Sequence, residues 1–185
     1  MKKIISMLIC TVMICCAVVL AVNTSAAVRN QVAKNSSGSY YYYDANSKIK
    51  TTLNGYHKVG NYRYYFKNGK ALTNTVVKER TYLRYFDANG RFSAVNGYKK
   101  VGSYYYYFVK GIAKANCVLK ISGKLRYFDA NGRFSAVNGY KKVGSYYYYF
   151  VKGIAKTNSV VKERTYFRFF DANGRFSAVN GYKKV

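Results

Sequence analysis

The chain repeats itself, and the repeat limits the folds that it can adopt. Residues 84–114 read RYFDANGRFSAVNGYKKVGSYYYYFVKGIAK, and residues 126–156 are the same string 42 positions later. A third copy begins at residue 168, and a diverged copy precedes the first at about residues 40–60. A period of this length indicates an array in which each repeat packs mainly on its neighbours.

Each unit divides into two halves with different turns. Phenylalanines recur with alternating spacings of 20 and 22, at Phe66, Phe86, Phe108, Phe128, Phe150 and Phe170. One half continues with Asp-Ala-Asn-Gly-Arg-Phe, as at 87–92, and the other with Val-Lys-Gly-Ile, as at 109–112. Glycine tolerates a positive φ, and the Asp can accept hydrogen bonds from nearby backbone N–H groups. Since β-favouring residues lie on both sides, we expect a hairpin about each turn, followed by a connecting segment.

A helical alternative is not supported. The tyrosine runs and β-branched residues show no sustained apolar period of about 3.6, and the chain has no Pro to interrupt a strand. One hairpin of this size is marginally stable, but stacked hairpins bury one face in a continuous core. The predicted fold class is therefore all-β, a solenoid of stacked β-hairpins built from half-repeats of about 20 residues.

The N-terminal region differs from the repeats. Residues 1–27 predict a secretory signal peptide, because Lys2 and Lys3 precede an apolar run that ends in small residues. The alternative is an uncleaved membrane anchor, since the run is almost long enough to span a bilayer. Residues 28–39 are polar and rich in Ser and Asn, which predicts a linker, and residues 40–185 form the expected repeat domain. We therefore expect a secreted protein that leaves the membrane after cleavage.

Charge and composition limit the classes of function that the chain can have. Lys and Arg number 32 against 6 Asp and Glu, a formal net charge of +26, which predicts an anionic partner. No catalytic triad, carboxylate pair or metal-ligand cluster emerges, so we expect no enzyme, cofactor or metal. His57 stands where other units have Lys, and Cys117 where they have Thr or Ser, which indicates a surface residue and a small filler. Glu79 and Glu163 lie beside basic residues, which predicts local charge pairing.

The repeat resembles a known family. The string at 97–108, Gly-Tyr-Lys-Lys-Val-Gly-Ser-Tyr-Tyr-Tyr-Tyr-Phe, and the string at 126–132, Arg-Tyr-Phe-Asp-Ala-Asn-Gly, carry the resemblance. They are similar to the cell-wall-binding repeat, of choline-binding or glucan-binding type, found on Gram-positive surface proteins and clostridial toxins. The resemblance covers about residues 40–185, and the Trp typical of that repeat is absent. It implies a hairpin solenoid at a Gram-positive cell surface that binds envelope polymers or glycans non-covalently.

The resemblance also implies candidate ligand residues, because the choline-binding branch holds its ligand in aromatic cages between adjacent hairpins. The first cage position corresponds to Tyr56, Tyr98, Tyr140 and Tyr182, and the second is Tyr at Tyr105 and Tyr147. Lysine pairs that follow two of the first positions complete the predicted set: Lys99, Lys100, Lys141 and Lys142. Tyr rings can stack on sugars while the lysines meet phosphate or carboxylate. The alternative is a purely structural role, in which these tyrosines pack against neighbouring residues and the lysines keep the surface soluble.

The sequence is compatible with several functions. The first is a non-catalytic module that binds an anionic wall polymer, such as teichoic acid, or a glucan, with avidity from repeated sites. Choline binding is an alternative, although cation–π attraction is weaker for Tyr than for Trp and the surface is cationic. A structural or adhesive protein could self-assemble through Tyr-rich strands at an open C-terminal edge near Val185. Nucleic-acid binding fits the basic and aromatic composition, but export disfavours it except for extracellular DNA.

Overall fold

The structure is a computed structural model of the chain that describes residues 27–178. The predicted signal peptide, apart from its last residue, lies outside the described residues, as do Tyr182 and the predicted edge near Val185. Within residues 27–178, no helix is long and apolar enough to cross a membrane.

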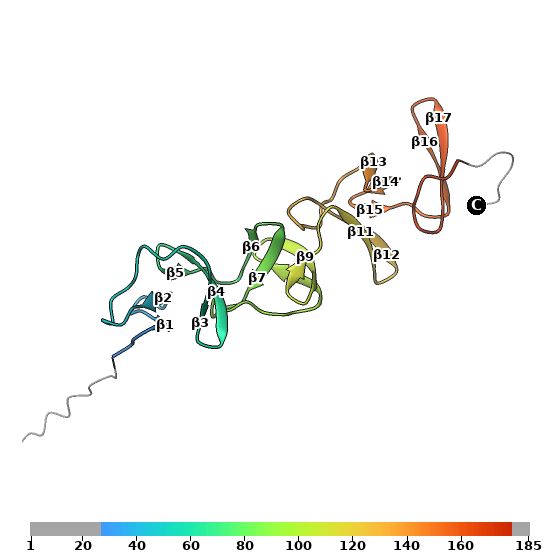
Figure 1. Ribbon diagram of the computed structural model, residues 1–185. Helices are drawn as coiled ribbons and strands as arrows, with labels where there is room; N and C mark the ends of the chain where they lie inside the picture. Colours follow the sequence, from blue (N-terminus) through green and yellow to red (C-terminus); the bar gives the residue numbers. More distant parts are fainter. Residues whose placement is uncertain (1–26, 179–185) are drawn as a thin grey trace, which may run out of the picture.

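The chain folds as a row of antiparallel hairpins, which confirms the predicted all-β array (Figure 1). Three five-stranded sheets follow one another along the chain, and a two-stranded sheet comes after them. The first sheet contains β1 (Gln31–Lys34), β2 (Tyr40–Tyr43), β3 (Gly55–Val59), β4 (Tyr62–Lys67) and β5 (Lys70–Ala71). The second contains β6 (Thr75–Glu79), β7 (Tyr82–Phe86), β8 (Gly97–Val101), β9 (Tyr104–Val109) and β10 (Ile112–Ala113).

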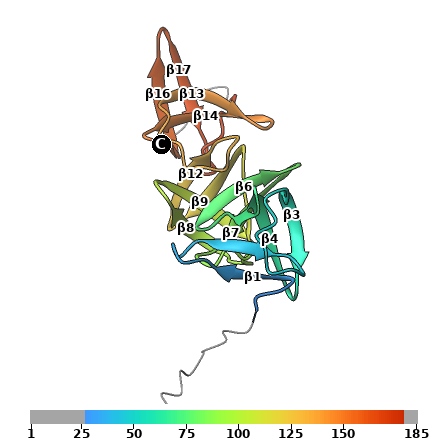
Figure 2. The same ribbon diagram turned by 90° about the vertical axis from the view of Figure 1, so that its left-hand side faces the viewer.

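The third sheet repeats the second, 42 residues later. It contains β11 (Cys117–Ile121), β12 (Lys124–Phe128), β13 (Gly139–Val143), β14 (Tyr146–Val151) and β15 (Ile154–Ala155). The last hairpin pairs β16 (Ser159–Glu163) with β17 (Tyr166–Phe170). In each five-stranded sheet, the two-residue strand (β5, β10 or β15) lies between the two longer hairpins, as in the order β6-β7-β10-β9-β8. Figure 2 shows the ribbons of successive hairpins pointing in different directions along the molecule.

The turns that join the long strands lie at other positions than the sequence pattern predicted, whereas the predicted Val-Lys-Gly-Ile turn does join β9 to β10, with Val109 paired with Ile112. The long strands are joined by two-residue turns that come before each tyrosine run, because Val101 pairs with Tyr104 and Glu79 pairs with Tyr82. The Asp-Ala-Asn-Gly segment instead closes a small loop, bracketed by an isolated bridge between Phe86 and Phe92. Asp87 does accept hydrogen bonds from two backbone N–H groups of its loop, as expected. The expected hairpin about each Asp loop is therefore wrong, because only one residue pair forms there.

The predicted linker is also wrong in part. Residues 31–34 form β1, which pairs antiparallel with the tyrosine run of β2 along four residue pairs. The strand itself reads Gln-Val-Ala-Lys, while the Ser and Asn residues of this segment lie mainly in the turn between β1 and β2. The Ser and Asn content of residues 28–39 therefore indicated the turn and did not reveal the strand. The array of hairpins thus begins before residue 40.

The core is built from the repeated phenylalanines. All six landmarks are between 0% and 1% exposed: Phe66, Phe86, Phe108, Phe128, Phe150 and Phe170. Phe108 packs against the rings of Tyr85 and Tyr106 at centroid distances of 5.4 and 5.7 Å. Consecutive sheets are joined by backbone hydrogen bonds of 2.7 Å, such as the one that Phe134 N–H donates to the Tyr105 carbonyl. This junction brings the loop after one Asp turn against the preceding tyrosine strand.

Candidate functional site

The predicted tyrosine pairs come together at the junctions between hairpins. Tyr98 on β8 stacks on Tyr105 on β9, with ring centroids 5.1 Å apart and an interplanar angle of 11°. Tyr140 stacks on Tyr147 in the next unit, at 5.0 Å and 5°. Diagonal neighbours in an antiparallel pair are within reach of such rings. The ring of Tyr98 also meets Phe128 of the following hairpin edge-on, at 6.2 Å.

Tyr56 lacks such a stacking partner, because the diagonal position on β4 is Arg63. Its ring meets Phe86 of the following hairpin edge-on, at 6.1 Å. Tyr182, the fourth predicted residue of this type, lies outside the described residues. The structure therefore brings together two of the predicted tyrosine pairs.

The predicted lysine pairs are split between the two faces of their strand. Lys100 Nζ lies 5.8 Å from the centroid of the Tyr105 ring, on the face that carries Tyr98. Lys99 Nζ instead lies 5.6 Å from the ring of Tyr85 in the preceding hairpin. The next unit repeats this division at 5.5 Å in both cases, for Lys142 over Tyr147 and for Lys141 over Tyr127. Adjacent strand residues point to opposite faces, so only the second lysine of each pair lies beside the stacked tyrosines.

Arginines lie closer to the tyrosines than the predicted lysines do. The sequence pattern had not predicted these arginines as ligand residues. Arg126 Cζ is 5.3 Å from the ring centroid of Tyr98 and 5.7 Å from that of Phe134. Arg84 takes the same place over Tyr56, at 4.7 Å. The available signal was an Arg that returns every 42 residues just before the buried aromatic pair and the Asp turn.

These arginines define three clusters at corresponding positions of the repeat. The Tyr56 cluster contains Tyr56, Arg84, Phe86 and Phe92. The Tyr98 cluster contains Tyr98, Tyr105, Arg126, Phe128 and Phe134. The Tyr140 cluster contains Tyr140, Tyr147, Arg168, Phe170 and Phe176.

Two of the clusters contain an ion pair, as the sequence predicted. Arg84 Nε lies 3.2 Å from Glu79 Oε2, and both side chains are about four-fifths buried. Arg168 pairs with Glu163 through its Nη1 in the Tyr140 cluster. Each glutamate lies diagonally across its hairpin from its arginine, two positions along from the residue directly opposite. The glutamate thus neutralises the guanidinium that lies over the tyrosine ring.

A second set of arginines covers the exposed tyrosines at the start of the long strands. Arg133 Cζ lies 3.9 Å from the ring centroid of Tyr104, and the pattern repeats for Arg91 over Tyr62 and Arg175 over Tyr146. A hydrogen bond with Tyr106 raises the pKa of Arg133 above its ordinary value. The guanidinium remains charged, so the tyrosine strands carry cations along the length of the array.

Burial and charge act in opposite directions on the cluster tyrosines. Burial raises the pKa of Tyr98, while the nearby Arg126 charge lowers it in part. The same balance holds for Tyr140 beside Arg168. Since the net shift is upward from a value near 10, these phenols are neutral at physiological pH and present intact hydroxyl groups.

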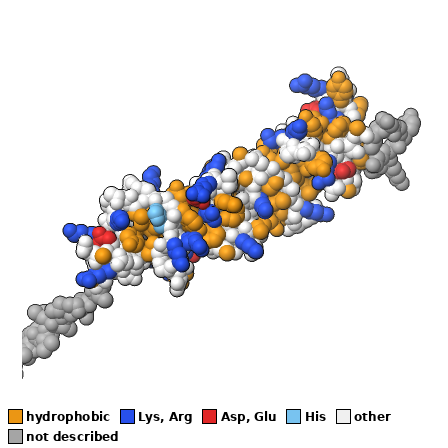
Figure 3. All heavy atoms as spheres, in the orientation of Figure 1, with side chains coloured by type: hydrophobic (Ala, Val, Ile, Leu, Met, Phe, Trp, Pro, Cys, Tyr) orange, Lys and Arg blue, Asp and Glu red, His pale blue; other side chains and the backbone are white. Residues whose placement is uncertain are grey.

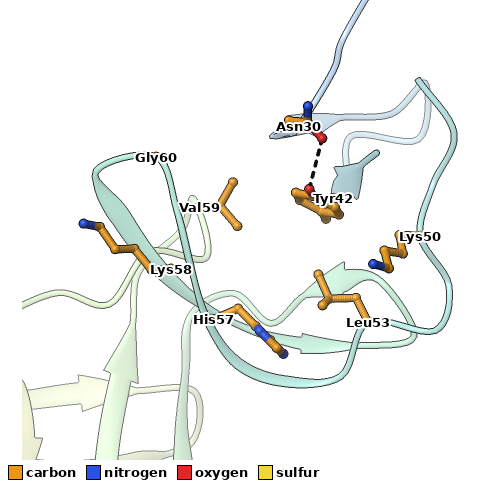
Figure 4. Close-up of a pocket in the computed structure, with 8 residues that line it drawn as sticks. All are labelled: Asn30, Tyr42, Lys50, Leu53, His57, Lys58, Val59 and Gly60. Carbon is orange, nitrogen blue, oxygen red and sulfur yellow. Dashed lines mark hydrogen bonds between the residues drawn. The ribbon is translucent and has the colours of Figure 1, made fainter. Parts of the chain in front are cut away.

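A hollow in the first sheet does not involve the predicted ligand residues. It has a volume of about 270 Å³, and Figure 4 shows Tyr42, Leu53 and His57 among its lining side chains. The Tyr42 hydroxyl lies 3.4 Å from Asn30 Oδ1. His57 is exposed, as expected, and its Nε2 lies 2.6 Å from the Asn54 carbonyl oxygen. In the described part of the chain, no group of three or more His, Cys, Asp or Glu residues could hold a metal ion.

Comparison with known proteins found matches among solved structures. No protein-family model and no curated protein matches the chain. CbpJ from Streptococcus pneumoniae matches with a TM-score of 0.49 and 23% identity, over 80% of this chain and 48% of that one. Choline-binding protein F from Streptococcus pneumoniae matches with a TM-score of 0.48 and 22% identity, again over 80% and 48%. A truncated alternansucrase from Leuconostoc mesenteroides matches with a TM-score of 0.40 and 23% identity, over 77% and 12%.

The matched region covers less than half of each of these solved chains. One of these solved structures is of a choline-binding protein.

Proposed function

We propose that the chain is a non-catalytic module that binds anionic cell-wall polymers or glycans, of teichoic acid or glucan type, at the surface of a Gram-positive bacterium. The observation that supports this most is the periodic pairing of tyrosine faces with cations. Tyr105 and Tyr147 are 42% and 40% exposed, and each has a lysine beside its ring. Figure 3 shows hydrophobic side chains, tyrosine included, along one face of the molecule with Lys and Arg among them.

An anionic partner fits the clusters better than choline does. In the Tyr56 and Tyr140 clusters, a guanidinium already lies 4.7 and 4.5 Å from the tyrosine centroid. A quaternary ammonium seeks the same ring face, so it would have to displace the arginine against a strongly positive surface. A sugar can instead stack on the exposed ring of Tyr105 while its phosphate or carboxylate meets Lys100. Equivalent sites 42 residues apart would then add avidity on a repeating polymer.

The test is retention of the protein on purified Gram-positive cell walls across a salt series. We expect binding that weakens as salt rises and that falls when wall teichoic acids are removed. The double variant K100A/K142A removes the lysines beside the stacked tyrosines. The matched control K114A/K156A removes the same charge from two exposed lysines in the same repeat positions of each unit.

K100A/K142A is expected to lower retention several-fold more than K114A/K156A does. Equal losses in the two variants would mean that only net charge attracts the protein to the wall. Competition by choline at low concentration, with no effect of dextran or teichoic acid, would favour the choline alternative instead.

A second candidate function, self-assembly into an adhesive surface array, has one observation in its favour. On β17, Phe167 is 71% exposed, whereas Leu83 at the same repeat position is only 8% exposed. Leu83 and Leu125 reach the glycines of later Asp turns, Gly132 and Gly174. Phe167 has no such cover within residues 27–178, so a second copy of the chain could bury it.

A further inference from the structure

The three clusters are not chemically equal. In the Tyr56 and Tyr140 clusters, Glu79 and Glu163 neutralise the arginine over the tyrosine. In the Tyr98 cluster, the repeat position of these glutamates is Ile121. The hairpin register is the same, since Ile121 pairs with Lys124 as Glu79 pairs with Tyr82. Arg126 therefore occupies the repeat position of Arg84 and Arg168, but it has no glutamate at the position where they find their partners.

No other acid in the chain can replace the missing partner. The six acidic residues are four aspartates and two glutamates. Each aspartate accepts hydrogen bonds from the backbone of its own turn: Asp44, Asp87, Asp129 and Asp171. Both glutamates are paired with Arg84 and Arg168. Every side-chain carboxylate is thus engaged, and within residues 27–178 Arg126 forms no ion pair.

The immediate surroundings of Arg126 increase the positive charge further. Lys124 stands where the other two hairpins have Tyr82 and Tyr166. It lies two residues from Arg126 on β12, so both side chains point to the same face of the strand. The Nε atom of Arg126 is buried and forms no hydrogen bond within the described residues, as is also true of Arg91, Arg133 and Arg175, whereas Arg84 Nε donates to Glu79. A half-buried guanidinium with an unpaired donor needs an acceptor, because burying a charge without one is costly.

We propose that the Tyr98 cluster is an oxyanion-binding site, in which Arg126 and Lys124 receive a carboxylate or phosphate group of a bound glycopolymer. The guanidinium carbon of Arg126 lies 5.3 and 5.7 Å from the ring centroids of Tyr98 and Phe134, which restrict its position. A planar guanidinium fixed in this way can offer two N–H groups to two oxygens of one anion. The neighbouring clusters bind their own glutamates instead. This assignment rests on the proposed function for the identity of the polymer, but the site itself is testable with small anions.

The first experiment follows the side-chain Nε–H signals of the arginines by NMR while an anion is added. Glycerol 3-phosphate is the phosphate probe and sodium glucuronate is the carboxylate probe, with sodium chloride at equal ionic strength as the control. We expect a saturable change in the Arg126 signal with at least one probe, while Arg84 and Arg168 change little. The probe that saturates first distinguishes phosphate from carboxylate. Equal, non-saturable changes in all three signals would overturn the proposal.

The chain supplies its own matched variants. Ile121→Glu places in the Tyr98 cluster the acid that the other two hairpins already carry, so we expect it to fold and to weaken anion binding roughly tenfold. Glu163→Ile does the reverse, and should give Arg168 a new saturable response to the same probe. Ile121→Val is the control, since it adds no acid and should leave the Arg126 response unchanged. Unaltered binding in Ile121→Glu would overturn the proposal.

The two proposals fail in different ways. If the protein is not retained on cell walls but Arg126 still responds to the small anions, the proposed function is wrong and the site stands. If wall retention is salt-dependent but Arg126 does not respond, or if Ile121→Glu retains anion binding, the proposed function stands and the site is wrong.

Discussion

At the scale of single residues, aromatic rings hold the molecule together while arginines determine its surface chemistry. Phe108 is fully buried and contacts the rings of Tyr85 and Tyr106. Tyr105, next to Tyr106 on the strand, is 42% exposed, and Lys100 lies over its ring. The same residue type is therefore buried or exposed according to its position along the strand.

Replacing a core phenylalanine should be far more costly than replacing an exposed one. Phe108→Ala removes a fully buried ring and is expected to lower the free energy of unfolding by about 3–5 kcal/mol. Phe167→Ala removes a ring that is 71% exposed and should change it by less than about 0.5 kcal/mol. Urea unfolding followed by circular dichroism measures both values. Similar losses in the two variants would contradict the assignment of the core.

At the scale of the elements, the short strand of each sheet determines how two hairpins join. Gly111 precedes β10, and its N–H donates to the Val95 carbonyl at 2.8 Å while its carbonyl accepts from Tyr85 N–H at 3.0 Å. One residue thus connects the β6–β7 hairpin, the chain after the Asp turn and β10. Such close approach of three backbone segments leaves no room for a side chain.

Alanine at this glycine should therefore disrupt the sheet. Gly111 has φ of +76°, and a Cβ atom there would lie 2.3 Å from the Ser93 carbonyl oxygen. The left-handed backbone alone costs roughly 1–2 kcal/mol, and the clash adds to it, so Gly111→Ala should cost more than about 2 kcal/mol. Gly102→Ala is the control, because its φ is +57° and no atom lies within 4 Å of its Cβ position. Equal destabilisation of the two variants in thermal unfolding would argue against the crowding at Gly111.

At the scale of the whole molecule, each sheet is joined to the next by backbone hydrogen bonds. The same backbone hydrogen bond recurs at each junction between sheets. The N–H groups of Phe92, Phe134 and Phe176 donate to carbonyls on the preceding tyrosine strands, at Arg63, Tyr105 and Tyr147. The last described hairpin, β16–β17, carries Tyr166 and Phe167, whose side chains are 64% and 71% exposed. Exposed aromatic rings of this kind offer a ready surface for association with another copy.

Self-association should accordingly depend on that hairpin. Sedimentation over a range of concentrations, at salt high enough to screen the positive charge, is expected to reveal a dimer or larger species in the wild type. Phe167→Ser should abolish the association. Val109→Ser alters a residue that is 40% exposed within the middle of the array and should have no effect. A wild type that stays monomeric throughout would exclude this second function.

Much of the fold could be predicted, because the repeat multiplies weak local signals. The 42-residue period and the β-favouring residues predicted the stacked hairpins, and Asp87 accepts backbone hydrogen bonds as expected, although only one residue pair forms about its loop. The two-residue turns at positions such as 102–103 were missed, since many short sequences are compatible with them and the strand register decides. The site was predicted only in part: Tyr98 and Tyr105 do stack, but Lys99 points away from them.

By itself, the sequence determined the period, the all-β class and the excess of positive charge. These properties depend on composition and on spacing along one chain segment. Only the tertiary structure decided that Arg126 lies over Tyr98, and that this arginine lacks the carboxylate that Arg84 has. The physical reason is that Tyr98 and Arg126 belong to different hairpins, so their contact depends on how one sheet packs on the next.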